Sequence, residues 1–235
     1  MATVATENPE NAAAPTVRRG LGGSTTLVVL AVLIALLSGV LIGRLTNQSE
    51  QAVPEPGRVD VGFAQDMSAH HAQAVEMSGI ALARSVTPEV RTLAYDVATS
   101  QQSQIGTMQG WLRWWNRPAV NAEAPMQWMD QGSGAGHSMP GQNGSAMPGM
   151  ATPDELRTLR QTSGSDFDAL YLRLLLRHHE GGLPMADYAR VNAETALVAE
   201  FADRIGQTQT AESDSIRQLL AMRDLGPLPL EQPHR

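Results

Sequence analysis

The chain contains no cysteine and no lysine, and aromatic residues make up only 4% of its 235 residues. The lack of cysteine excludes disulfides, thiolate metal sites, zinc ribbons and cysteine nucleophiles. The lack of lysine means that all 17 positive charges are arginines, scattered along a chain with 24 acidic residues and a net charge of −7. Such a chain lacks the basic patch of a nucleic-acid-binding protein, so we expect no nucleic-acid partner.

The residues that are present favour helices. Hydrophobic residues account for 42% of the chain, which is enough for a packed core, and scarce aromatics with many alanines favour close-packed helices over a sheet. Methionine is frequent, with 11 residues, and four of the six histidines form two His-His pairs. These pairs and the methionines are the candidate functional residues.

The N-terminal part predicts a membrane anchor. Residues 24–42 contain no charge, and a helix of this length spans roughly 28 Å, about one bilayer core. Arg18 and Arg19 precede the run, which places the N-terminus in the cytoplasm. We therefore expect a cytoplasmic disordered tail at 1–23, a single-pass signal anchor in the plasma membrane at 24–43 and a tether at 44–57. The alternative, a cleaved signal peptide, has only a poor small-x-small site at residues 38–40.

The rest of the chain contains an internal repeat. A shift of 108 residues aligns residues 60–112 with residues 168–220 without a gap, and ten of the 53 positions are identical. His70, His71 and Met77 are among the identities, and their counterparts are His178, His179 and Met185. A repeat of this length indicates two copies of one supersecondary unit.

Each copy has the pattern of a helical hairpin. Apolar and histidine positions recur every three or four residues from Phe63 to Ala81 and again from Tyr171 to Ala189, as in packed antiparallel helices. Two hairpins predict an all-α, up-and-down four-helix bundle over residues 58–224. Its expected parts are a first hairpin at 58–116, a Gly/Pro/Met-rich linker at 117–151 and a second hairpin at 152–224. Residues 225–235 form a tail. Pro184 should kink the helix that contains it.

Helical spacing also predicts a polar layer inside the bundle. Its expected members are His70, His178, Gln101, Gln104, Gln209 and Glu212, with His71 and His179 partly buried at its edge. Two interpretations stay open. The layer can be a structural network that only fixes helix packing, or it can bind metal, since buried polar groups destabilise a bundle unless each finds a partner.

The residue types select the class of metal. Neutral imidazole is the commonest protein ligand of late transition metals, and thioether sulfur suits Cu(I) or Ag(I). Imidazole also accepts Cu(II), Zn(II) and Ni(II). A di-iron oxidase needs Glu-x-x-His motifs, and no predicted helix contains one. We therefore expect copper, or another late transition metal, bound with an affinity that falls as the pH drops through the usual histidine range.

The two His-His segments resemble a known bacterial family. Met67-xx-His70-His71-xxxxx-Met77, and Ser165-Asp-Phe-Asp168 leading to His178-His179-Glu180-Gly and Met185, are similar to the domain of unknown function 305 family. This resemblance implies an exported, ferritin-like four-helix bundle, and some members of the family are linked to copper. Together with the spacing, it assigns a candidate metal site to His70, His71, Met77, His178, His179, Met185, Met67 and Glu212. Gln104 and Pro184 depart from a symmetric arrangement, which indicates two unequal half-sites.

The linker adds a second candidate metal site. His137, Met139, Met147 and Met150 lie in a tract like those of exported copper-handling proteins, although methionine can be incidental in a Gly/Pro linker. The sequence thus favours a membrane-anchored, extracytoplasmic protein for copper buffering, scavenging or relay. The alternative is a non-catalytic interaction or structural bundle. An enzyme ranks third, because no nucleophile–base pair or carboxylate dyad is visible.

Overall fold

The computed structural model describes residues 22–47, 55–122, 124–129 and 147–230. These residues form six helices and, within the described ranges, no strand. The helices are α1 (Gly22–Asn47), α2 (Arg58–Arg84), α3 (Pro88–Trp114), α4 (Pro153–Gln161), α5 (Gly164–Asn192) and α6 (Ala196–Ala221). The expected all-α architecture is therefore confirmed.

Helix α1 forms a compact unit of its own, separate from the rest of the chain. Its segment Thr26–Arg44 has a mean hydropathy of 2.8 over 19 residues. By length and composition this helix can cross a membrane.

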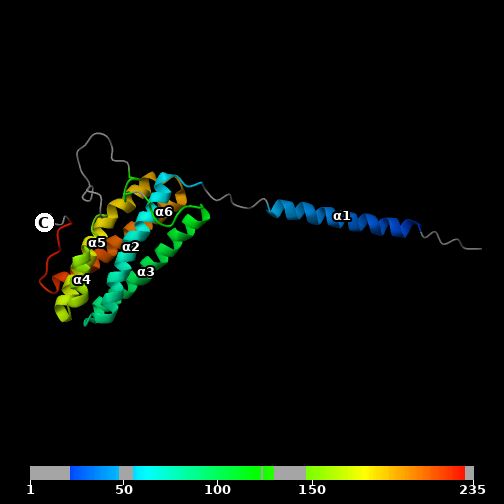
Figure 1. Ribbon diagram of the computed structural model, residues 1–235. Helices are drawn as coiled ribbons and strands as arrows, with labels where there is room; N and C mark the ends of the chain where they lie inside the picture. Colours follow the sequence, from blue (N-terminus) through cyan, green and yellow to red (C-terminus); the bar gives the residue numbers. More distant parts are fainter. Residues whose placement is uncertain (1–21, 48–54, 123, 130–146, 231–235) are drawn as a thin grey trace, which may run out of the picture. The chain divides into compact units, whose positions relative to one another are not determined.

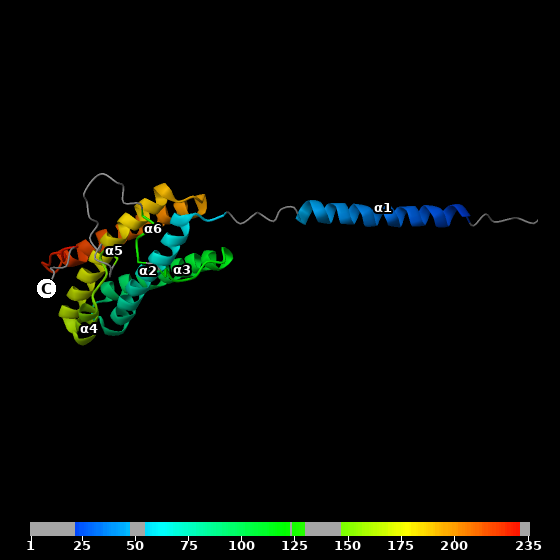
Figure 2. The ribbon, with the colours of Figure 1, turned by 45° about the horizontal axis from the view of Figure 1, so that its top comes forward.

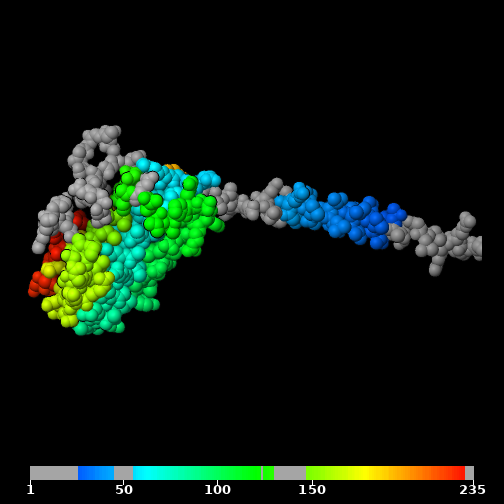
Figure 3. All heavy atoms as spheres, viewed as in Figure 1, coloured from blue at the N-terminus to red at the C-terminus, as the bar shows by residue number. Residues whose placement is uncertain are grey.

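The other five helices form the bundle. α2 packs on α3 and α5 packs on α6, so the four long helices form two hairpins, and α2 and α5 join the two hairpins by direct contact (Figures 1 and 2). The short helix α4 packs on α5 and also lies beside α2 (Figure 3). Arg160 of α4 pairs there with Glu76 of α2. Pro184 does not end α5, which continues to Asn192.

Two reciprocal contacts fix how the hairpins pair. Asp60, at the start of α2, accepts hydrogen bonds from the backbone N (3.2 Å) and the hydroxyl (2.9 Å) of Thr195, at the turn after α5. Asp168, near the start of α5, accepts one from the hydroxyl of Thr87, at the turn after α2. Each aspartate therefore binds the turn of the opposite hairpin. Because both contacts join the start of one helix to the end of the other, α2 and α5 run antiparallel.

The apolar core is split into two clusters. One contains the part of α2 that follows the His-His pair and the part of α5 that precedes it, including Met77 and Tyr171. The other contains the opposite parts of the two helices, including Met67 and Met185. The two histidine pairs lie between the clusters along both helices, so the polar layer crosses the middle of the bundle.

Candidate metal centre

The antiparallel packing of α2 and α5 brings the two His-His pairs together. The ring centroids of His70 and His178 lie 3.8 Å apart, with 33° between the ring planes. All four histidine side chains are completely buried. The expectation that His71 and His179 would be only partly buried is wrong, since neither is exposed to solvent.

His71 and His179 make equivalent contacts in the two repeats. Nε2 of His71 lies 2.7 Å from Oε1 of Gln104 on α3, and Nε2 of His179 lies 2.7 Å from Oε2 of Glu212 on α6. The two partners are 108 residues apart, as are the two histidines. The contacts differ in charge, because only the second partner is a carboxylate.

His70 and His178 bind backbone carbonyls instead, and here the two halves differ. Nε2 of His178 lies 3.0 Å from the carbonyl O of His70, across the helix contact. Nε2 of His70 lies 3.1 Å from the carbonyl O of Pro148, in the linker. The half-sites are thus unequal, because His70 meets a carbonyl of the linker and His178 meets one of α2.

These contacts determine which ring nitrogens can bind a metal. Carbonyl and carboxylate oxygens accept hydrogen bonds, so each Nε2 carries the ring hydrogen and each Nδ1 keeps a lone pair. None of the four Nδ1 atoms has a hydrogen-bond partner among the described residues. In metal-binding histidines one nitrogen commonly binds the ion while the other donates to a carbonyl or carboxylate. In each of the four imidazoles, Nε2 already lies against such an oxygen atom and Nδ1 is the nitrogen left for the ion.

Burial keeps the imidazoles of His70, His71 and His178 neutral. Removal from water lowers the pKa of His70 to about 4, against a rise from its bond to Pro148. Burial and the neighbouring His70 lower the pKa of His71 to about 3. The pKa of His178 also lies well below its usual value, first through burial and then through the three nearby histidines. Neutral imidazole is the form that binds metals.

The three candidate methionines lie on both sides of this layer. Met67, Met77 and Met185 are completely buried, with Met67 and Met185 in one apolar cluster and Met77 in the other. Within the described ranges, no three His, Asp or Glu side chains are grouped to hold an ion together. An ion here would therefore need a thioether ligand or a shift of the imidazoles.

Two glutamines complete the layer. Gln101 and Gln209, which are repeat equivalents, are 1% and 2% exposed, and neither side-chain amide has a hydrogen-bond partner in the described part of the chain. A Cβ at Gly182 would lie 2.8 Å from Oε1 of Gln209 and 3.1 Å from Cε1 of His70. The glycine therefore lets Gln209 and His70 approach the α5 backbone closely.

The second candidate site is only partly described. His137 and Met139 lie outside the described residues. Met147 is buried and Met150 is half-buried, and they flank the Pro148 carbonyl that contacts His70. These two methionines thus belong to the surroundings of the main histidine cluster. The contact between the backbone carbonyl of Pro148 and His70 could not be predicted from the sequence, because a backbone carbonyl is common to all residues.

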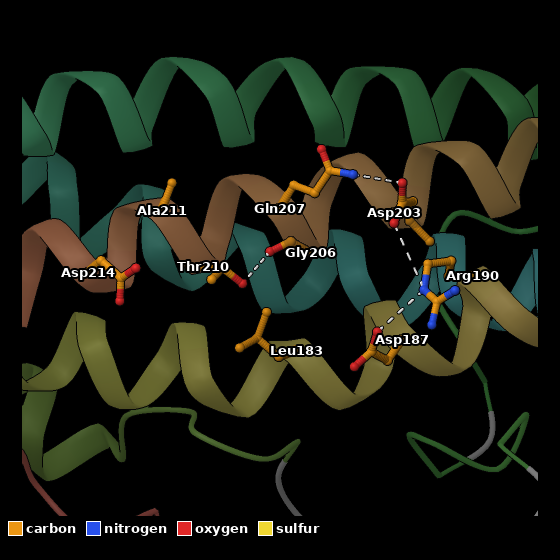
Figure 4. A pocket seen from close by; sticks show the side chains of 10 residues that line it. Leu183, Asp187, Arg190, Asp203, Gly206, Gln207, Thr210, Ala211 and Asp214 are labelled. Carbon is orange, nitrogen blue, oxygen red and sulfur yellow. Dashed lines mark hydrogen bonds and ion pairs between the residues drawn. The ribbon is translucent and has the colours of Figure 1, made fainter.

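A groove on the outer face of α5 and α6 lies apart from the histidines. It is lined by Leu183, Asp187 and Arg190 of α5 and by residues of α6 from Ala202 to Asp214 (Figure 4). Arg190 lies between Asp187 (3.5 Å) and Asp203 (3.9 Å), so its charge is already paired. The groove contains none of the candidate metal ligands.

Comparison with known proteins identifies the family. The profile of the family described as Domain of unknown function (DUF305) matches residues 60–220, which include both hairpins. The chain belongs to the DUF305 family. This confirms the resemblance noted in the two His-His segments.

Solved structures of other DUF305 proteins have the same fold. A protein of Streptomyces coelicolor, described as a secreted DUF305 protein, is 39% identical, with a TM-score of 0.64 over 73% of this chain and 97% of its own. A DUF305 fragment from Deinococcus radiodurans is 28% identical, with a TM-score of 0.58 over 72% of this chain and 99% of its own.

A third similar structure is that of a metal-binding protein. CopM in its Cu(II)-bound form is 27% identical to this DUF305 chain, with a TM-score of 0.54 over 70% of this chain and 97% of its own. No curated protein matches the chain.

Proposed function

We propose that this DUF305 protein is a membrane-anchored, extracytoplasmic copper-binding protein that buffers, scavenges or relays the ion. The observation that carries the proposal is the set of four buried Nδ1 atoms without hydrogen-bond partners. Each belongs to an imidazole whose Nε2 is oriented by an oxygen atom. A polar layer that served only to fix helix packing would be expected to satisfy these nitrogens.

The ligand chemistry supports copper among the late transition metals. Neutral imidazoles and thioethers together bind copper better than they bind cations that prefer oxygen ligands. The similarity to CopM in its Cu(II)-bound form points in the same direction. Among the described residues, Glu212 is the one carboxylate that hydrogen-bonds to an imidazole of the site, and burial penalises a high charge, so the site favours Cu(I) over Cu(II).

The proposed site residues are the eight assigned from the sequence. His70, His71, His178 and His179 provide the nitrogen ligands, and Met67, Met77 and Met185 are the thioethers nearest to them along α2 and α5. Glu212 orients His179 through Nε2 and partly neutralises a bound cation. We assign no reaction to the site, because its role is to bind and release the ion.

We infer that the site lies outside the cytoplasm. Arg18 and Arg19 before the apolar run favour a cytoplasmic N-terminus, so the bundle that follows α1 would face the other side of the plasma membrane. There the protein would meet copper before the ion reaches the cytoplasm.

Metal titration of the soluble fragment from Arg58 onward tests the proposal. The bundle is a compact unit without α1, and the Streptomyces coelicolor relative is covered over 97% of its length by the matching part of this chain. Cu(I) and Cu(II) are titrated against a chromophoric chelator. We expect binding by the wild type and its loss when His70, His71, His178 and His179 are all replaced by alanine.

The control is His234→Ala, which removes a histidine from the C-terminal tail and should leave binding unchanged. If the fourfold variant is not helical by circular dichroism, the double variants His70→Ala/His71→Ala and His178→Ala/His179→Ala replace it. Equal affinity of the wild type and the folded histidine variants would exclude the metal site and leave the structural role of the layer.

A further inference from the structure

The described end of the linker lies across the histidine cluster. We call residues Met147–Ala151 the strap. On the α2 side, Ala151 makes two hydrogen bonds with Gln73, one donated by its own N–H (2.6 Å) and one accepted by its carbonyl (2.9 Å). Between these bonds and α5, the carbonyl of Pro148 accepts the hydrogen of Nε2 of His70 (3.1 Å). The strap therefore bridges α2 and α5 at the point where His70 and His178 meet.

On the α5 side, two glycines let the strap backbone touch the helix backbone. Gly149 has a φ of +78°, and a Cβ there would lie 2.4 Å from the carbonyl O of Arg177. A Cβ on Gly181 would lie 2.3 Å from the carbonyl O of Pro148. Any side chain at either position would push the strap away, because real Cβ atoms do not approach other atoms so closely.

Two further contacts, one apolar and one polar, attach the strap to the bundle. Met147 is buried in the apolar cluster that contains Met67 and Met185. Arg177, which is 3% exposed, binds both carboxylate oxygens of Glu155 on α4 (2.8 and 2.6 Å) and lies 3.5 Å from the carbonyl of Met150. The ion pair thus connects Arg177, next to His178, with α4, which follows the strap.

The strap differs from the long helices around the histidine site because its backbone is not helical. These helices have 26 to 29 residues with continuous backbone hydrogen bonding. The strap has five residues, and the side chains that hydrogen-bond to its backbone are those of Gln73, His70 and Arg177. Segments with few backbone hydrogen bonds open locally at a smaller cost in free energy than long helices.

We infer that the strap is the gate through which a copper ion enters and leaves the buried histidine site. This inference rests on the proposed function. When the strap lifts, His70 loses the acceptor of its Nε2 hydrogen, whereas His178 keeps the carbonyl of His70 on α2. His70 is therefore the first histidine that an incoming ion meets, and it is the residue whose ring is free to turn.

The replacement Gly181→Ala tests the gate. Its Cβ would collide with Pro148 and lift the strap, while alanine remains a good helix residue in α5. Gly79→Ala is the matched control, because this glycine also lies within a long helix and a Cβ there has nothing within 4 Å. The rate of Cu(I) loading and the rate of Cu(I) loss to a chelator are measured by stopped flow on the fragment from Arg58.

We expect both rates to rise about tenfold in Gly181→Ala, as they would if the closed strap lost about 1.4 kcal/mol, and to stay at the wild-type value in Gly79→Ala. Gln73→Ala removes both bonds to Ala151 without adding an atom and should act in the same direction. Its control is Gln102→Ala, on the exposed face of α3. Hydrogen exchange at Met150 and Ala151 should quicken in the two strap variants only.

The outcomes separate the gate from the site. If the wild type binds no copper, the proposed function fails. If the wild type binds copper and both strap variants load and release it at the wild-type rate, the site stands and the gate is overturned. Quicker hydrogen exchange in the strap with unchanged metal rates has the same meaning, because an open strap that does not change the rates is not the ion's route.

Discussion

Nε2 of His179 lies 2.7 Å from the carboxylate of Glu212, whereas Nε2 of the equivalent His71 lies 2.7 Å from the uncharged amide of Gln104. Replacing Glu212 with glutamine would give both halves the same neutral partner. A carboxylate behind an imidazole makes it a stronger ligand, so Glu212→Gln should weaken copper binding about tenfold, at the lower end of such effects.

Competition with a chelator measures this affinity in the fragment from Arg58. Glu200→Gln is the control, since it removes one negative charge from an exposed position of the same helix. Equal affinities of the two variants would show that Glu212 acts only through the overall charge of the protein.

The buried histidines should make the stability of the metal-free bundle depend on pH. The pKa of His71 is about 3 in the folded protein and near 6.5 in the unfolded chain, so between these values only the unfolded chain binds the proton. The free energy of unfolding should therefore fall, as the pH drops below 6.5, by about 1.4 kcal/mol per pH unit for each such histidine. Above pH 6.5 both states are neutral and this contribution is fully present.

Urea unfolding at pH 7 and at pH 5 checks this dependence. In His71→Gln, the free energy of unfolding should depend on pH less steeply, by the contribution of one histidine. This difference separates the effect of the histidine from that of the carboxylates. An unchanged slope would contradict the buried neutral state. Protonation of the imidazoles should also release a bound metal. Because burial lowers the pKa of His70 to about 4, we expect this release near pH 4 and not in the usual histidine range.

Asp60 should be one of the most important polar residues for stability. It is fully buried and accepts hydrogen bonds from the backbone of Gly57 (2.8 Å) and from the backbone and hydroxyl of Thr195. Asp60→Ala would leave the buried Thr195 donors without a partner, so the free energy of unfolding should fall by about 2–3 kcal/mol. Asp96→Ala, at an exposed site of α3, should change it by less than about 0.5 kcal/mol. Urea denaturation compares the two variants, and similar losses would refute the role of Asp60.

The full chain should remain attached to the membrane through α1. We expect it in the membrane fraction with its N-terminus intact, because residues 24–42 are long enough to span the bilayer and a good cleavage site is lacking. N-terminal sequencing of the membrane-bound protein checks this. A mature protein that starts near Val40 or Leu45 would show that α1 is a cleaved signal. Protease added outside intact cells should degrade the bundle but spare the N-terminal tail.

Much of the architecture could be predicted because it depends on local patterns. The three- and four-residue spacing around His70 and His178 places them on the inner face of a helix whatever the helix packs against. The shift of 108 residues predicted that Gln104 and Glu212 would occupy equivalent positions, and both contact a histidine. The DUF305 resemblance needed only the His-His pairs and the methionines that follow them.

The sequence by itself determined the helices, their inward faces and the presence of paired histidines among methionines, because these follow from periodicity and residue type. Only the tertiary structure decided that His71 and His179 are fully buried, that each aspartate binds the turn of the other hairpin, and that Pro148 covers His70. These features depend on the approach of segments far apart in the chain and, for Pro148, on a backbone carbonyl. Periodicity shows which face of a helix is inside, but only the packed chain shows which backbone atom lies against that face.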